Sequence, residues 1–160
     1  MRAAVLTVSD GVARGERQDE SGDLLASLLA DAGFEVEREV AADDRHAISS
    51  ALESLIERAG VVLTTGGTGF AMRDITPEAT AAFIDRPAPG VAEAIRADAI
   101  AKTPHGLLSR GLAGISGKTL IVNLPGSPGA CRDGFAVLRP ALAHALDLLS
   151  EETTTVHEQT

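Results

Sequence analysis

The chain has 160 residues, of which 44% are hydrophobic and 23% are charged, as is typical of one globular domain. No stretch approaches the roughly eighteen consecutive apolar residues that a membrane helix needs, so we expect no membrane-spanning segment. The N-terminal sequence MRAAVLTVSDG reaches an aspartate too early for a secretion signal, and we expect a cytoplasmic location. Cys131 is the only cysteine, which excludes an internal disulfide, a zinc finger and a CxxC redox pair.

Acidic residues outnumber basic ones, with 23 Asp and Glu against 14 Lys and Arg and a formal charge of −9. This charge repels a phosphate backbone, and the only aromatic residues on which bases could stack are four Phe. We therefore expect no nucleic-acid partner. An anionic ligand would have to be bound locally, by backbone amides, helix N-termini, a few basic side chains and a metal.

The first half of the chain alternates apolar runs with helical patterns. These predict a buried strand over Ala3–Val8, a helix over Ser21–Ala32 with Ser21 as its N-cap, a sheet-edge strand over Phe34–Val40, a helix from Asp43 or Asp44 to Ala59, and a buried strand over Gly60–Thr65.

The second half continues in the same way. It predicts a short helix from an N-cap at Thr76 to about Ile84, a helix over Gly90–Lys102, a buried strand over Thr119–Leu124, and a last helix that begins at Ser127-Pro128 and that Pro140 either restarts or kinks. Residues 1–150 are expected to form the single domain, and the polar segment 151–160 a loose tail.

Strands that alternate with helices at this spacing predict an α/β fold whose parallel sheet is covered on both faces. Such sheets bind ligands beyond the carboxyl ends of their strands. Polar or glycine-rich segments follow three of the predicted strands, at Ser9–Gly11, Thr65–Gly69 and Asn123–Ser127. If those strands are neighbours, the three segments form one site.

Gly66, Gly67 and Gly69 have no Cβ, so backbone N–H groups there can approach an anion closely. The segment is neither a P-loop nor GxGxxG, and a tight strand-to-helix turn is the alternative interpretation. Asp74 follows this loop and is either an oxygen ligand for Mg²⁺ near the phosphates or a solvated loop residue.

Other candidates are equally open on the residues alone. Asp43 and Asp44 either face the same crevice or cap the following helix. Ser109 and Arg110 either contact a ligand phosphate or heterocycle, or form an exposed loop pair. The four His residues have no metal-ligand spacing, and no GxSxG motif is present.

Five segments in fixed order resemble the molybdopterin adenylyltransferase family, which includes the bacterial MogA and MoaB proteins and the gephyrin G domain. They are LTVSD (6–10), TTGGTGF (64–70), RDITPEAT (73–80), LLSRGLAGISGKTLIVNLPGSP (107–128) and LRPALAHAL (138–146). The resemblance implies a three-layer α/β/α fold with a mostly parallel sheet, commonly as a homotrimer. It also implies transfer of AMP from Mg-ATP to the terminal phosphate of molybdopterin, with release of pyrophosphate.

Residue by residue, the resemblance implies an essential aspartate at Asp43 in AADDRHAI, with Ala42 where relatives often have proline, so that Asp44 stays an alternative. It places a second aspartate at Asp74 and a pterin-binding serine at Ser109. The glycine loop matches in full, whereas Ala71-Met72 replaces a common Thr-Pro.

These matches lead to a working assignment of roles. Asp43 and Asp74 position Mg²⁺ and ATP, and Ser109 and Arg110 face the pterin phosphate. Three parts of the pocket bind the nucleotide. They are the glycine loop at Gly66, Gly67, Thr68 and Gly69, the floor at Ser9 and Asp10, and the rim at Asn123, Gly126 and Ser127.

Two other functions stay open. The first is a MoaB-like protein that binds or carries molybdopterin without adenylylating it, because matching residues do not measure catalysis. The second is a scaffold by analogy with gephyrin, which the short chain disfavours. The expected partners are molybdopterin, ATP and the molybdenum-insertion protein.

Overall fold

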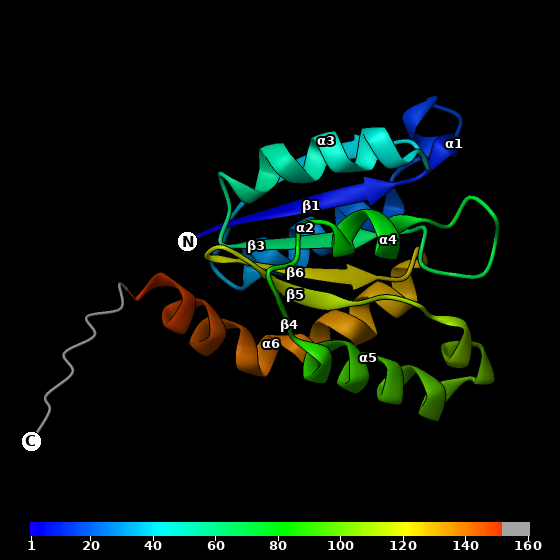
Figure 1. The fold of residues 1–160 in the computed structure, drawn as a ribbon. Helices are drawn as coiled ribbons and strands as arrows, with labels where there is room; N and C mark the ends of the chain where they lie inside the picture. Colours follow the sequence, from blue (N-terminus) through cyan, green and yellow to red (C-terminus); the bar gives the residue numbers. More distant parts are fainter. Residues whose placement is uncertain (152–160) are drawn as a thin grey trace, which may run out of the picture.

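The computed structural model describes residues 1–151, which form one six-stranded sheet between two layers of helices (Figure 1). In spatial order the strands are β2 (Glu35–Ala41), β1 (Arg2–Val8), β3 (Val61–Thr65), β6 (Thr119–Leu124), β5 (Ala113–Ser116) and β4 (Arg86–Pro87). The first four are mutually parallel, and β5 runs antiparallel to both of its neighbours. The predicted mostly parallel sheet is confirmed.

Two separate apolar cores hold the layers together. One face of the sheet packs against α2 (Glu20–Asp31), α5 (Pro89–Lys102) and α6 (Pro128–Ser150). The other face packs against α3 (Arg45–Ile56) and α4 (Thr76–Ala81). The helical elements α1 (Asp10–Ala13) and η1 (Pro104–Leu108) are short. This arrangement confirms the three-layer α/β/α fold.

The central strands are apolar along their whole length because both of their faces are covered. In β1, Ala3 and Val5 enter one core while Ala4 and Leu6 enter the other, as the alternation of side chains along a strand requires. The edge strand β2 alternates charged with apolar residues instead, and its edge position is confirmed.

Two predicted helix starts need correction, and the structure decides between the two alternatives at Pro140. The N-cap of α2 is Asp19, whose carboxylate accepts a hydrogen bond from Gly22 N at 3.0 Å, and not Ser21, which lies inside the helix. The N-cap of α4 is Ile75, because Thr76 uses its hydroxyl to donate to the carbonyl of Gly66. Helix α6 is continuous through Pro140, which therefore does not restart it.

The prediction did not include β4, β5, α1 or η1. Strands β5 and β6 form a hairpin around Gly117, which has a φ of 57°. Strand β5 has the sequence AGIS, too short and too small in its side chains for a strand signal. Part of the loop expected around Ser109 is thus regular structure.

The tail expected over residues 151–160 lies outside the described residues except for Glu151, so the division at residue 150 stays a prediction. Within residues 1–151, no helix has both the length and the apolar content needed to cross a membrane.

Candidate active site

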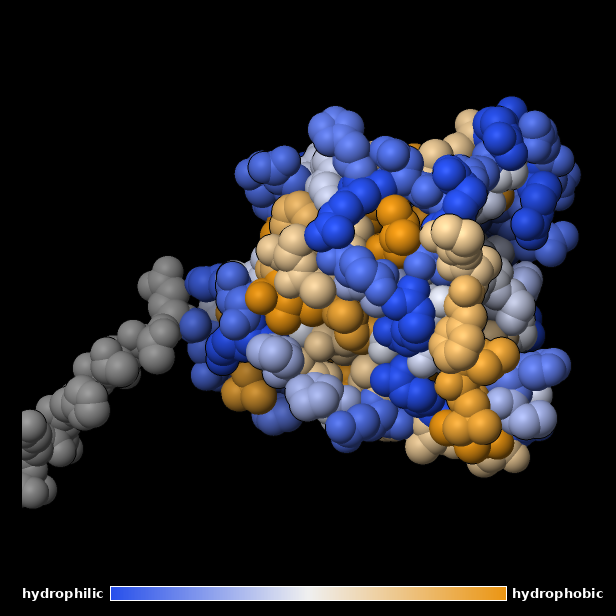
Figure 2. All heavy atoms as spheres, turned by 45° about the vertical axis from the view of Figure 1, so that its right-hand side comes forward, coloured by the Kyte–Doolittle hydropathy of each residue, from blue (hydrophilic) through white to orange (hydrophobic). Residues whose placement is uncertain are grey.

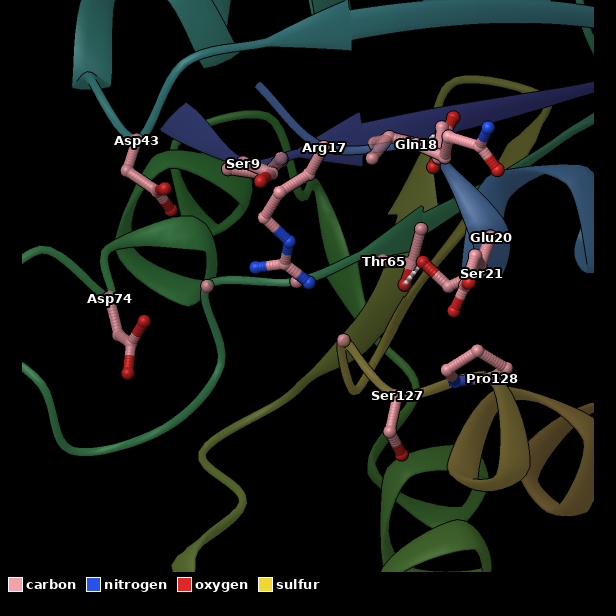
Figure 3. Close-up of a pocket in the computed structure, with 16 residues that line it drawn as sticks. Ser9, Arg17, Gln18, Glu20, Ser21, Asp43, Thr65, Asp74, Ser127 and Pro128 are labelled. Carbon is pink, nitrogen blue, oxygen red and sulfur yellow. Dashed lines mark hydrogen bonds between the residues drawn. The ribbon is translucent and has the colours of Figure 1, made fainter. Parts of the chain in front are cut away.

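The carboxyl ends of β1, β3 and β6 lie side by side and open onto one cleft of about 470 Å³. Its walls come from the segments after these strands, from the loop after β2 and from the N-termini of α2 and α6 (Figure 3). The expectation that the three polar strand ends form a single site is therefore confirmed. The cleft lies at the edge of the sheet where parallel α/β folds bind their ligands.

The glycine loop begins with two residues in the left-handed region, Gly66 at φ 98° and Gly67 at φ 67°. A Cβ on Gly66 would lie 2.2 Å from the carbonyl oxygen of Val8, and one on Gly67 would lie 2.3 Å from Oγ1 of Thr76. Thr76 holds this turn by donating from its hydroxyl to Gly66 O at 2.9 Å and from its backbone N–H to Gly67 O at 3.1 Å. Only glycine fits both positions.

Asp43 and Asp10 exchange hydrogen bonds between two strand ends. The backbone N–H of Asp10 donates to Asp43 Oδ2 at 2.9 Å, and the backbone N–H of Asp43 donates to Asp10 Oδ1 at 3.0 Å. The neighbouring Asp44 caps α3, where its carboxylate accepts from Ala47 N at 2.9 Å. The structure thus separates the two alternatives: Asp44 is the cap, and Asp43 lines the cleft.

The electrostatic surroundings of Asp10 and Asp43 differ. Arg73 binds Asp10 with two hydrogen bonds, from Nε at 2.6 Å and from Nη2 at 3.0 Å, and these lower the pKa of the Asp10 carboxyl. Burial raises the pKa of Asp43, and the negative charges of Asp10 and Asp74 raise it further. Asp43 is therefore the carboxylate that a bound cation would stabilise, whereas Asp10 already has its counter-ion.

Asp74 reaches the same cavity from the far end of the glycine loop, and Figure 3 shows both carboxylates on one side of the cavity. Its Oδ2 accepts a hydrogen bond from Ala71 N at 3.0 Å, and a Cβ on Gly69 would lie 2.9 Å from the same oxygen. Arg110 fixes this part of the loop by donating to Gly69 O at 2.8 Å and to Asp74 O at 2.6 Å.

These two carboxylates suit a magnesium ion that is shared with a substrate. No group of three or more His, Cys, Asp or Glu side chains within residues 1–151 is arranged to hold a metal. Mg²⁺ in phosphoryl-transfer sites commonly takes one or two carboxylates and completes its shell with water and phosphate oxygens. Asp43 and Asp74, on either side of a glycine loop open to phosphates, fit that pattern.

Helix α6 presents its N-terminus to the opposite side of the cleft. Ser127 is its N-cap, with Oγ accepting from Ala130 N at 3.2 Å, and both Ser127 and Pro128 line the cavity. The partial positive charge of a helix N-terminus favours an anion there. Gly126 precedes Ser127 in this part of the lining, whereas Ser9, the N-cap of α1, lines the cleft on the side of Asp43 (Figure 3).

Other predicted site residues bond to neighbouring parts of the protein and do not line the cleft. Asn123 is buried, with Nδ2 donating to the hydroxyls of Thr64 at 2.9 Å and Thr80 at 3.0 Å. The Ser109 hydroxyl accepts from Gly111 N at 3.3 Å, and Arg110 forms an ion pair with Glu78. Among the predicted residues, those absent from the cleft lining are Asp10, Thr68, Gly69, Ser109, Arg110 and Asn123.

One wall of the cleft was missed by the sequence reasoning. It is formed by the segment that leads into α2, namely Arg17, Gln18, Asp19, Glu20 and Ser21. Ser21 is joined to the cleft floor because Thr65 Oγ1 donates to Ser21 Oγ at 3.0 Å. The one available signal was Asp19 itself, since aspartate is a preferred N-cap residue and directly precedes the helical pattern.

With this geometry established, the domain family described as "Probable molybdopterin binding domain" matches residues 4–144. The chain belongs to this family. A relative from Helicobacter pylori (strain J99), named molybdopterin adenylyltransferase, is 36% identical over 160 residues, covering 97% of this chain and 91% of the relative. A second, the Drosophila melanogaster "Molybdenum cofactor synthesis protein cinnamon", is 39% identical, but this chain spans only 26% of its length.

Solved structures of the family agree with the fold. A MogA structure superposes with a TM-score of 0.90 at 41% identity, covering 94% of this chain and all of that one. The molybdopterin biosynthesis enzyme MoaB from Thermus thermophilus has a TM-score of 0.88 at 45% identity, over 94% and 97% of the two chains. The resemblance and the fold class predicted from the sequence are both confirmed.

Proposed function

We propose that this protein is a molybdopterin adenylyltransferase, which transfers AMP from Mg-ATP to the terminal phosphate of molybdopterin and releases pyrophosphate. The observation that carries the proposal is the placement of Asp43 and Asp74 on either side of the glycine loop, in one cleft at the carboxyl edge of the sheet. Relatives that bear this enzyme name, of which this chain covers 91% and 70%, support it.

In the proposed reaction, an oxygen of the molybdopterin phosphate attacks the α-phosphorus of ATP. A new P–O bond forms as the bond to the bridging oxygen of the β-phosphate breaks, and pyrophosphate leaves with that electron pair. The reaction needs no protein nucleophile, because alignment and charge neutralisation supply the catalysis.

The chain's own residues divide this work. Asp43 and Asp74 hold Mg²⁺, which neutralises phosphate charge when it is bound. The loop at Gly66 and Gly67 and the N-terminus of α6 at Ser127 offer backbone N–H groups to phosphate oxygens. Arg73 occupies Asp10 and so keeps a third carboxylate from repelling the triphosphate.

Pyrophosphate release from Mg-ATP, measured with and without molybdopterin, tests this function. We expect release that depends on molybdopterin and that matches the amount of adenylylated pterin formed. Retention of molybdopterin by the protein without any release would contradict the proposal.

That contradicting result would support the second candidate, a molybdopterin-binding or carrier protein. The observation in its favour is that the family description names binding of molybdopterin and no reaction. The two candidates share the cleft and differ only in turnover.

Assembly and location complete the proposal. We infer that the protein is a cytoplasmic homotrimer and that a molybdenum-insertion protein is its partner. Apolar side chains gather on the side of the molecule shown in Figure 2, and the large exposed ones on the loop after β3 and on η1 are Phe70, Met72, Leu107 and Leu108. Exposed apolar surface of this kind favours an interface, and sedimentation equilibrium measures the mass of the assembly directly.

A further inference from the structure

Arg17 extends into the cleft from the segment between α1 and α2, and Figure 3 shows its guanidinium group pointing toward the centre of the cavity. It is the only Lys or Arg among the residues that line this cavity. The same lining contains four carboxylates, on Asp19, Glu20, Asp43 and Asp74. The positive side chain therefore lies where the proposed substrates bring their phosphate groups.

Other basic side chains around the cleft are already engaged. Arg73 binds Asp10, Arg110 binds Glu78, and Arg38 binds both Asp19 and Asp23. Arg17 takes part in none of the ion pairs found within residues 1–151. Its donors are thus available to a ligand.

The position of Arg17 is set by the backbone around it. Its N–H donates to Gly11 O at 3.2 Å, and that carbonyl also accepts from Glu16 N at 2.9 Å. The aliphatic part of the side chain packs over Gly11, where a Cβ would lie 2.9 Å from Arg17 Cδ. The absence of a side chain at Gly11 therefore leaves the space that the arginine crosses on its way to the cavity.

We propose that Arg17 is a substrate-positioning residue whose guanidinium binds a phosphate group in the cleft. The proposal for Arg17 rests on the proposed adenylyltransferase function and assigns to that site a side chain that binds phosphate. The phosphate belongs either to the triphosphate of ATP or to the terminal phosphate of molybdopterin, and a guanidinium can bind either one with two parallel hydrogen bonds. Asp19 is not a competitor for Arg17, because Arg38 and Thr7 occupy it.

The test compares Arg17→Ala and Arg17→Lys with Arg14→Ala, a control in the same segment whose side chain pairs with Glu16 outside the cleft. Binding of Mg-ATP, of inorganic pyrophosphate and of molybdopterin is measured by calorimetry, and KM and kcat are measured for ATP and for molybdopterin. We expect Arg17→Ala to raise the KM of one substrate by about tenfold to a hundredfold, which is the effect of losing a charged hydrogen bond, with a smaller change in kcat.

Arg17→Lys should recover part of the lost affinity, because it keeps the charge but not the planar fork. Weaker pyrophosphate and ATP binding assigns the phosphate to ATP, whereas an effect confined to the KM of molybdopterin assigns it to the pterin. If Arg17→Ala matches Arg14→Ala in every binding constant and KM, the proposal is wrong. Calorimetry does not require turnover, so titrations with Mg-ATP, pyrophosphate and molybdopterin still test Arg17 if the wild-type protein fails to release pyrophosphate.

Discussion

Asp43 differs from its neighbour Asp44 in its surroundings rather than in its chemistry. Asp44 is exposed and satisfied by the first turn of α3, whereas Asp43 is half-buried and faces two other carboxylates. Such clustering of like charges stores unfavourable energy that a bound cation relieves. A cation bound beside Asp43 would therefore stabilise the folded protein relative to the form with an empty cleft.

This predicts that Asp43→Asn raises stability while it removes function. A carboxyl whose pKa is raised on folding stabilises the fold below its unfolded pKa, and this contribution is lost as the pH rises through its folded pKa. At neutral pH the neutral amide avoids that loss and can still accept the hydrogen bond from Asp10 N. We expect a melting temperature above that of the wild type at pH 7, with the difference disappearing toward acidic pH; a lower melting temperature at pH 7 would contradict this.

Gly67 offers a second test at this scale. Alanine there meets both an unfavourable φ of 67° and a contact of 2.3 Å with Thr76 Oγ1. We expect Gly67→Ala to lower the free energy of unfolding by about 2 kcal/mol or more in urea titrations, and to reduce activity at least tenfold because its Cβ also lies 3.2 Å from Asp43 Oδ1.

Gly33→Ala is the matched control, because Gly33 has a φ of 93° but nothing within 4 Å of an added Cβ. It carries the backbone strain without the clash and should keep full activity. Equal losses of stability in the two variants would show that the contact with Thr76 is unimportant.

At the scale of elements, the long and strongly patterned segments were predictable and the short ones were not. Strands β1, β3 and β6 are apolar throughout because helices cover both of their faces. Their apolar sequences made them recognisable as buried parallel strands, so the sequence also predicted that their carboxyl ends lie side by side. Strand β4 has only two residues and β5 only four, so neither carries a usable pattern. The N-cap of α2 was misplaced because Asp19 and Ser21 are both good caps two residues apart.

Arg110, in the segment between η1 and β5, holds the loop between β3 and α4 in place. It was predicted to face the pterin, yet its backbone N–H donates to Thr68 O at 2.8 Å and its guanidinium holds the carbonyls of Gly69 and Asp74. We expect Arg110→Ala to speed amide hydrogen exchange over residues 66–74 and to lower kcat for both substrates. A change confined to the KM of molybdopterin, with exchange unaltered, would instead support direct contact with the pterin.

At the scale of the whole molecule, the excess of acidic residues coexists with a cleft suited to anions. The formal charge of −9 excludes long-range attraction of phosphates. Under the proposed function, phosphates would therefore be bound locally, by the glycine loop, the N-terminus of α6, Arg17 and a metal on the cleft carboxylates. The acidic composition predicted that an anion must be bound locally, and the polar segments after the strands predicted where the binding site lies. Arg17 could not be anticipated, since an arginine in a charged loop carries no pattern until the fold brings it to the cavity.

The central claim is that Asp43 and Asp74 form the reactive centre of this cleft. The most direct test is molybdopterin-dependent pyrophosphate release by Asp43→Asn, Asp74→Asn and the control Asp44→Asn, in which asparagine keeps the cap of α3. We expect kcat/KM to fall by at least a hundredfold in the first two variants, with folding intact, and to stay at the wild-type value in the third. Wild-type rates in both Asp43→Asn and Asp74→Asn would contradict the account.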